Sequence, residues 1–185
     1  MARVARFAVH GGADILQLRA KKLPFKMALR LAKTIQGIAR RHNALFIIND
    51  RIDIAASIAC DGLHIGQGDI DISLARKLLH KETIVGVSVK NISQALLAKG
   101  SGADYLGIGP VFKTPIKADT RPRGVGLLKA VKHLGIPSFA IGGINIKNIQ
   151  QLVRQGVTKV AVIRAVCAAA DPYREAKRLK DILKR

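Results

Sequence analysis

The sequence predicts a parallel α/β fold of the TIM (β/α)₈ barrel class that lacks its first strand. Short apolar runs recur mostly every twenty to thirty residues, and patterns typical of amphipathic helices lie between them. Almost every apolar run ends in glycine, a charged residue or an amide. Because parallel strands carry their chemistry at their carboxyl ends, this order indicates an α/β enzyme.

Seven strands are expected, at 14–19, 44–49, 62–66, 83–88, 105–109, 138–142 and 159–163. Similar turns precede four of them, which is typical of junctions from helix to strand: Gly12-Ala13-Asp14, Asp61-Gly62, Gly102-Ala103-Asp104 and Gly156-Val157. The chain opens with a helical pattern over 2–10, so a complete barrel would need one more strand. A shortened start, or pairing with another subunit in a homo-oligomer, would account for the difference.

Helical periodicity fills the intervals between the expected strands. The segment 25–42 carries an apolar stripe, and similar patterns cover 93–99, 124–134 and 145–154. The basic segment 173–185 also has the pattern of an amphipathic helix. Ser73 and Asn91 are suited to cap the amino ends of their helices.

Composition favours one domain over residues 1–185, because no linker or abrupt change of composition divides the chain. Hydrophobic residues make up 49% of the chain but aromatic residues only 4%, so the core must be aliphatic. No apolar stretch approaches the roughly 20 residues that span a bilayer, and the start lacks a signal peptide's apolar segment. We therefore expect a cytoplasmic protein in which Cys60 and Cys167 are buried free thiols.

The formal net charge of +20 raises the question of an anionic partner. The cations are spread along the chain rather than gathered in one block, and aromatic side chains that could stack on bases are scarce. This distribution argues against a nucleic-acid partner, although binding by charge alone is an alternative. It favours a solvated basic surface that attracts anionic small molecules.

Two aspartates follow consecutive expected strands. Asp50 comes directly after one strand and Asp69 follows the next, which in a barrel places them side by side at one mouth. Two carboxylates with room for water, near phosphate-binding groups, make a typical Mg²⁺ site. The alternative is that each aspartate is a helix cap or part of a surface ion pair.

Cations and glycines at other strand ends suggest an anionic substrate. Arg19 and Lys21 follow one strand, and Lys117 lies in the loop after another. With Mg²⁺ they could hold a pyrophosphate and stabilise it as a leaving group. The pair Gly142-Gly143 precedes a helix expected near Asn145, where backbone amides could bind a phosphate, unless the glycines only form a tight turn.

Other polar residues are interpreted as structural. His64 alternates with apolar strand residues and is expected to be a packed side chain rather than a catalyst. Asp53 and Asp104 are expected to serve turns or caps.

The sequence resembles the thiamine phosphate synthase family, whose nearest relative is the thiazole tautomerase. The resemblance covers nearly the whole chain, in family order. The matching motifs are Gln17-Leu18-Arg19-Ala20-Lys21, Asn49-Asp50-Arg51-Ile52-Asp53, Gly66-Gln67-Gly68-Asp69, Gly86-Val87-Ser88, the segment from Gly102 to Phe112, Thr114 with Lys117, and Ile141-Gly142-Gly143-Ile144.

The resemblance implies a TIM barrel that joins a hydroxymethylpyrimidine pyrophosphate to a thiazole phosphate. Pyrophosphate would leave first, and the thiazole nitrogen would capture the pyrimidine carbocation. By position, Asp50 and Asp69 would bind the Mg²⁺ cofactor. The residues implied to hold the pyrophosphate are Arg19, Lys21, Asn49 and Lys117; Gln17 and Ser88 would lie near the pyrimidine, and Thr114 and Gly143 would bind the thiazole phosphate. Arg19, Ser88 and Lys117 are the expected catalytic residues.

The sequence also departs from the family pattern. Ile116 replaces one threonine of the Thr-x-Thr-Lys motif, and Arg164 follows Ile163 where the family has a serine. Ile163 and Arg164 are expected to line the substrate site, where Arg164 could contact phosphate or block the pocket. Lys90 replaces the histidine that the tautomerase uses as acid and base, which favours the synthase. A tautomerase-like protein or a catalytically impaired binding homologue is the alternative.

Overall fold

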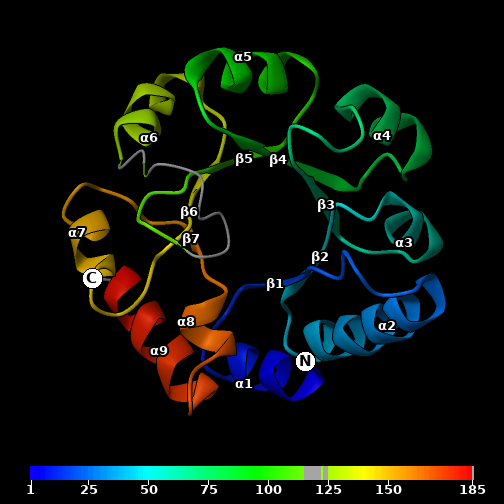
Figure 1. Cartoon of the computed structure of the whole chain (residues 1–185), viewed down its shortest axis with the longest axis horizontal. Coiled ribbons are helices and arrows are strands. Elements are labelled where there is room, and N and C mark those ends of the chain that lie inside the picture. Colours follow the sequence, from blue (N-terminus) through cyan, green and yellow to red (C-terminus); the bar gives the residue numbers. More distant parts are fainter. Residues whose placement is uncertain (115–121, 123–124, 185) are drawn as a thin grey trace.

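A computed structural model describes residues 1–114, 122 and 125–184. Seven parallel strands form one sheet whose spatial order follows the chain, and the sheet curls around a central axis (Figure 1). The strands are β1 (Ile15–Leu18), β2 (Leu45–Asn49), β3 (Gly62–Ile65), β4 (Ile84–Val89), β5 (Tyr105–Ile108), β6 (Ser138–Ile141) and β7 (Val160–Ala161). All seven expected strands are confirmed, within two residues at each end.

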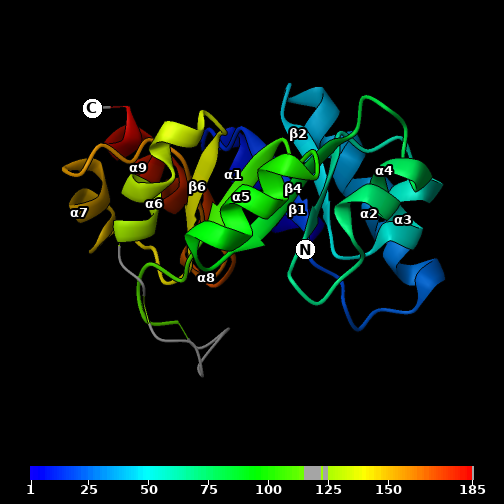
Figure 2. The same cartoon turned by 90° about the horizontal axis from the view of Figure 1, so that it is seen from above.

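Helices surround the sheet on its outer side (Figures 1 and 2). They are α1 (Ala2–His10), α2 (Phe25–Arg41), α3 (Ile52–Ser57), α4 (Ile72–Leu78), α5 (Ile92–Gly100), α6 (Gly126–Ala130), the 3₁₀ helix η2 (Lys132–Leu134), α7 (Ile149–Val153), α8 (Arg164–Cys167) and α9 (Pro172–Leu183). No helix of the described residues is long and apolar enough to cross a membrane.

The sheet has two edges. Within the described part of the chain, β1 pairs only with β2 and β7 only with β6. Helix α1 packs against both α2 and α9, so the first and last helices lie side by side (Figure 1). The expected seven-stranded barrel-class sheet is therefore present, and it is open between β1 and β7.

The core lies between the sheet and the helices. Leu63 and Ile65 on β3, and Leu106 and Ile108 on β5, are at most 2% exposed and point to this layer. Because side chains alternate along a strand, the residue between each of these pairs faces the interior of the curled sheet instead. The interior positions can therefore be polar without disrupting the core.

Two local expectations concerned helix caps, and one of them is wrong. Asn91 caps α5, because its side chain accepts a hydrogen bond from the N–H of Gln94 over 2.9 Å. Ser73 does not cap α4, since the cap position is Asp71 and Ser73 lies inside the first turn.

The cysteines also differ from each other. Cys60 is buried, as expected, and its thiol donates to the carbonyl of Ala55. Cys167 is exposed at the end of α8, so the prediction of a buried thiol there is wrong.

Candidate active site

A cluster of charges lies at the carboxyl ends of β1, β2 and β3. It consists of Lys21, Asp50 and Asp69, which we call the carboxylate cluster. The Nζ atom of Lys21 lies 2.5 Å from Oδ2 of Asp50 and 3.8 Å from Oδ1 of Asp69. Since β1, β2 and β3 are adjacent, their carboxyl-end loops bring these residues together, as the sequence predicted.

The backbone holds both aspartates in place. Asp50 has a positive φ of 63°, a left-handed conformation that Asp tolerates better than most residues. Its N–H donates to the carbonyl of His64 over 2.8 Å, which ties the end of β2 to β3. Oδ2 of Asp69 accepts a hydrogen bond of 2.7 Å from the N–H of Gly66 and so closes the loop after β3.

The pKa values of the two carboxyl groups are shifted in opposite directions. Burial raises the pKa of Asp50, and the neighbouring Asp69 raises it further, against the opposing effect of Lys21. Burial also acts to raise the pKa of Asp69, but hydrogen bonds with Asp50 and Gly66 and the charges of Lys21 and Arg19 lower it overall. The pair therefore binds a proton on Asp50 more readily than on Asp69 when no further cation is present.

The donor set of this cluster fits a hard divalent cation. Oδ2 of Asp50 is buried, and although Lys21 lies close to it, this oxygen accepts no well-directed hydrogen bond from the described residues. No group of three or more His, Cys, Asp or Glu that could hold a metal occurs in the described part of the chain. Two carboxylates suit Mg²⁺, which commonly keeps waters and takes its remaining ligands from substrate phosphates.

Four further pyrophosphate and pyrimidine candidates lie on β1, β2 and β4 or just after them. Gln17 and Arg19 are exposed, on and just after β1, and the charge of Arg19 reaches Asp69. Asn49 is only 8% exposed and stands opposite His64 in the sheet register. Ser88 is half-buried near the end of β4. The four residues therefore come from β1, β2 and β4, which all lie within the first four strands of the sheet.

The loops after β5 and β6 are in direct contact. The N–H of Phe112 donates to the carbonyl of Gly142 over 3.1 Å. Gly143 has a φ of 72°, and a Cβ there would lie 2.7 Å from the carbonyl oxygen of Phe112. A side chain at position 143 would therefore collide with the β5 loop, which carries the buried Thr114. The contact brings together the two loops that hold the predicted phosphate-binding residues Thr114 and Gly143.

The helix expected to begin near Asn145 begins later, at Ile149. The side-chain amide of Asn148 donates to the carbonyl of Gly143 over 2.9 Å, and that of Asn145 does so over 3.3 Å. These hydrogen bonds favour an irregular turn over residues 143–148. The predicted contribution of a helix amino end at Asn145 is therefore wrong, although the glycine turn itself is present.

The other predicted residues divide into two groups. Ile163 and Arg164 are exposed after β7, where α8 begins. Lys117, with the replaced position Ile116, lies outside the described residues. Nothing in the contacts of the described residues joins Arg164 to the carboxylate cluster.

Two aspartates expected to have structural roles do have them. Asp53 lies in the first turn of α3 and forms two hydrogen bonds with Arg51, of 2.6 and 2.8 Å. Asp104 accepts from the N–H of Val85 over 2.6 Å and pairs with Arg76. These contacts hold helices and strand starts in place.

A polar row inside the curled sheet was not foreseen. It consists of His64, Ser88 and Tyr105, which we call the interior polar row. His64 is buried, as predicted for a packed side chain, but its Nδ1 lies 2.9 Å from Oη of Tyr105 and its Nε2 lies 2.9 Å from Oγ of Ser88. The signal in the sequence that could have indicated this row is the alternation of glycine with a polar residue. Gly86 alternates with Ser88 on β4, and Tyr105 alternates with Gly107 on β5.

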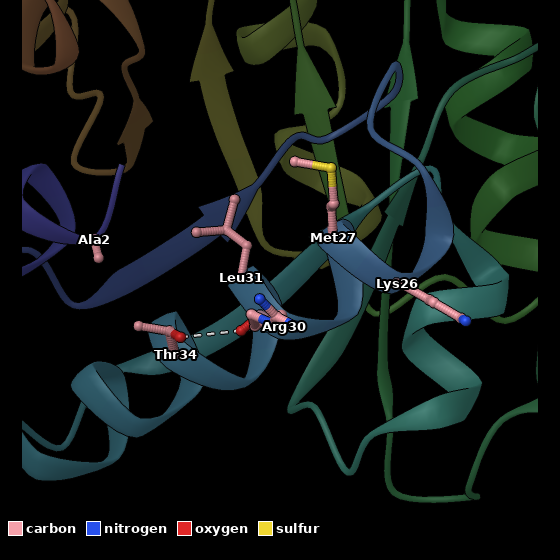
Figure 3. Close-up of a pocket in the computed structure, with 6 residues that line it drawn as sticks. All are labelled: Ala2, Lys26, Met27, Arg30, Leu31 and Thr34. Carbon is pink, nitrogen blue, oxygen red and sulfur yellow. Dashed lines mark hydrogen bonds between the residues drawn. The ribbon is translucent and has the colours of Figure 1, made fainter.

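A hollow of about 360 Å³ lies elsewhere and is lined by residues of α1 and α2 (Figure 3). Its lining residues are Ala2, Lys26, Met27, Arg30, Leu31 and Thr34. The only hydrogen bond among them joins Thr34 to the carbonyl of Arg30 within α2. The lining of this hollow includes none of the predicted site residues, so the strand ends remain the candidate active site.

The family model and two curated relatives that match this chain are named for the same synthase activity. The family model described as thiamine monophosphate synthase matches residues 1–166. The thiamine-phosphate synthase of Methanospirillum hungatei is 40% identical over 183 residues, which cover 98% of this chain and 89% of that protein. That of Moorella thermoacetica is 43% identical over 184 residues, covering 98% and 88%.

Other relatives are longer. The thiamine-phosphate synthase of Thermosynechococcus vestitus is 42% identical over 170 residues, which are 91% of this chain but 48% of that protein, so the chain spans about half of its length. Among solved structures, thiamine phosphate pyrophosphorylase from Pyrococcus furiosus superposes with a TM-score of 0.92 at 37% identity, covering 99% of this chain and 89% of the other.

Proposed function

The chain belongs to the thiamine monophosphate synthase family, and on that premise we propose how its residues perform the family's transferase reaction. A hydroxymethylpyrimidine pyrophosphate and a thiazole phosphate are joined to thiamine phosphate, and pyrophosphate is released. The observation that carries this assignment is the carboxylate cluster, in which Lys21 lies within 3.8 Å of both Asp50 and Asp69. A cation-binding carboxylate pair beside a lysine suits a pyrophosphate better than a neutral ligand.

Asp50 and Asp69 would hold Mg²⁺. The buried and incompletely bonded Oδ2 of Asp50 supports this role, as does the low proton affinity of Asp69. When bound, the ion would supply positive charge that stabilises the departing pyrophosphate.

Arg19 and Lys21 would bind the pyrophosphate oxygens. The Lys21 side chain is 43% exposed, so it can contact the carboxylates and still reach a phosphate on the solvent side. Arg19 is exposed and close enough for its charge to affect Asp69. Asn49 and Lys117 complete the proposed pyrophosphate set. Because the charge of the leaving group increases as its bond breaks, these cations stabilise the transition state more than the bound substrate.

Gln17 and Ser88 would position the pyrimidine, since Gln17 lies on β1, which leads to Lys21 of the carboxylate cluster, and Ser88 lies on β4, which is next to β3. Thr114 and Gly143 would bind the thiazole phosphate, supported by the contact between their loops. Ile163 and Arg164 would line the part of the site that binds the thiazole phosphate. The thiazole nitrogen then attacks the pyrimidine methylene carbon after the bond to pyrophosphate has broken, so one C–O bond is replaced by one C–N bond.

Turnover of the purified chain tests this function. Incubation with both substrates and Mg²⁺ should yield thiamine phosphate and pyrophosphate in equal amounts. The variant Lys21→Met should lose most of this activity, whereas Lys22→Met, which changes the next residue in the chain, should retain it. Binding of both substrates without product would exclude catalysis and leave a ligand-binding homologue.

A further inference from the structure

The interior polar row depends on the register of three adjacent strands. Residue His64 on β3 stands opposite Gly86 on β4, and Gly86 stands opposite Tyr105 on β5. A Cβ at position 86 would lie 1.9 Å from Cζ of Tyr105. Because Gly86 has no side chain, the rings of His64 and Tyr105 meet across it, with centroids 5.4 Å apart.

Ser88 lies two residues nearer the carboxyl end of β4. It stands opposite Gly107, where a Cβ would lie 3.0 Å from Cε1 of His64. A second glycine therefore gives the imidazole its space, and its Nε2 reaches Oγ of Ser88. The carbonyl of Ser88 accepts a further hydrogen bond of 2.8 Å from the side chain of Gln67. Both the backbone and the side chain of Ser88 are thus held.

The direction of these hydrogen bonds follows from the tyrosine. Burial raises the pKa of the Tyr105 hydroxyl above its ordinary value, so the phenol keeps its proton at neutral pH. Within the described residues, the hydroxyl's one hydrogen bond is with Nδ1 of His64. A buried O–H donates where an acceptor is available, so Nδ1 accepts and a neutral imidazole carries its proton on Nε2.

The consequence concerns the hydroxyl of Ser88. If Nε2 of His64 donates to its oxygen, the Ser88 proton is free to point toward the mouth of the curled sheet. We propose that Tyr105 and His64 are positioning residues that fix the Ser88 hydroxyl as a hydrogen-bond donor, which selects an aromatic ring with an unprotonated nitrogen. This inference rests on the proposed function, because that function places the pyrimidine beside Ser88.

The histidine tautomer can be measured without any substrate. NMR of protein labelled with ¹⁵N-histidine, with the His64 signals assigned from a His64→Gln variant, should show a protonated Nε2 and an unprotonated Nδ1. A proton on Nδ1 would overturn the proposal. Because this result does not depend on turnover, it distinguishes failure of the proposal from failure of the proposed function.

Affinity tests the selection itself. Tyr105→Phe keeps the ring that fills the space over Gly86 but removes the hydroxyl. It should weaken binding of hydroxymethylpyrimidine pyrophosphate by roughly threefold to tenfold, as expected for one hydrogen bond, and leave the affinity for inorganic pyrophosphate unchanged. The exposed Tyr173 provides the matched control, since Tyr173→Phe should change neither affinity. Equal losses for both ligands, or no loss for either, would contradict the positioning role.

Discussion

Replacement of Gly86 by alanine tests the packing on which the interior polar row depends. The added Cβ would lie 1.9, 2.2 and 2.5 Å from three ring atoms of Tyr105. Carbon atoms in contact are ordinarily about 3.5–4.0 Å apart, so the ring would have to move by roughly 1.5 Å or more. Movement is restricted, because the ring packs edge-on against Phe139 and its hydroxyl bonds to His64.

Overpacking of this kind costs about 1–3 kcal/mol, and the close approach to ring atoms places Gly86→Ala near the upper end. For a chain of this size, about 3 kcal/mol corresponds to a fall in Tm of roughly 6–12 °C. Differential scanning calorimetry measures the fall, and Gly37→Ala is the control. A Cβ at Gly37 meets nothing within 4 Å, and alanine in a helix should maintain or raise Tm. If both variants melt at the wild-type temperature, the described packing is wrong.

Three further predictions concern other parts of the structure. Asp69→Asn should lower Mg²⁺-dependent turnover by on the order of a hundredfold. It should change the free energy of unfolding by less than about 1 kcal/mol, because the amide oxygen can still accept the hydrogen bond from the loop backbone. Unchanged turnover would exclude the metal role. The hydrogen bonds from Arg51 lower the pKa of Asp53, so their stabilising effect is present above the ordinary value of 3.8 and is lost as pH falls through the lower folded value. Asp53→Asn should therefore reduce the free energy of unfolding, measured by urea denaturation, by less than about 1 kcal/mol at pH 7. The two proteins should become equally stable in strong acid, and a difference in stability that persists there would refute the pairing of Asp53 with Arg51. A thiol reagent should modify the exposed Cys167 before the buried Cys60, as peptide mapping would show, and the opposite order would contradict the packing of α8.

The sequence allowed the strands and their functional ends to be predicted because both signals are local. Apolar runs such as 45–48 mark buried parallel strands, and polar residues such as Asp50 follow directly. Adjacent strands in chain order then place Asp50 and Asp69 in neighbouring loops, so the carboxylate cluster could be foreseen.

The interior polar row could not be predicted in the same way. His64 alternates with apolar neighbours, which indicates its burial, but its partners are set by the register of β3, β4 and β5. A shift of one residue would place a different side chain opposite it. The start of α7 was also missed, because the asparagines at 145 and 148 bond to the turn after Gly143 instead of extending the helix.

Binding of inorganic pyrophosphate, measured by titration calorimetry with and without Mg²⁺, tests most directly whether Asp50 and Asp69 form a metal-dependent pyrophosphate site. We expect measurable binding when Mg²⁺ is present and little in its absence, and we expect Asp69→Asn to bind weakly under both conditions. Equal binding by the wild-type chain with and without Mg²⁺, or full Mg²⁺-dependent binding by Asp69→Asn, would contradict the assignment.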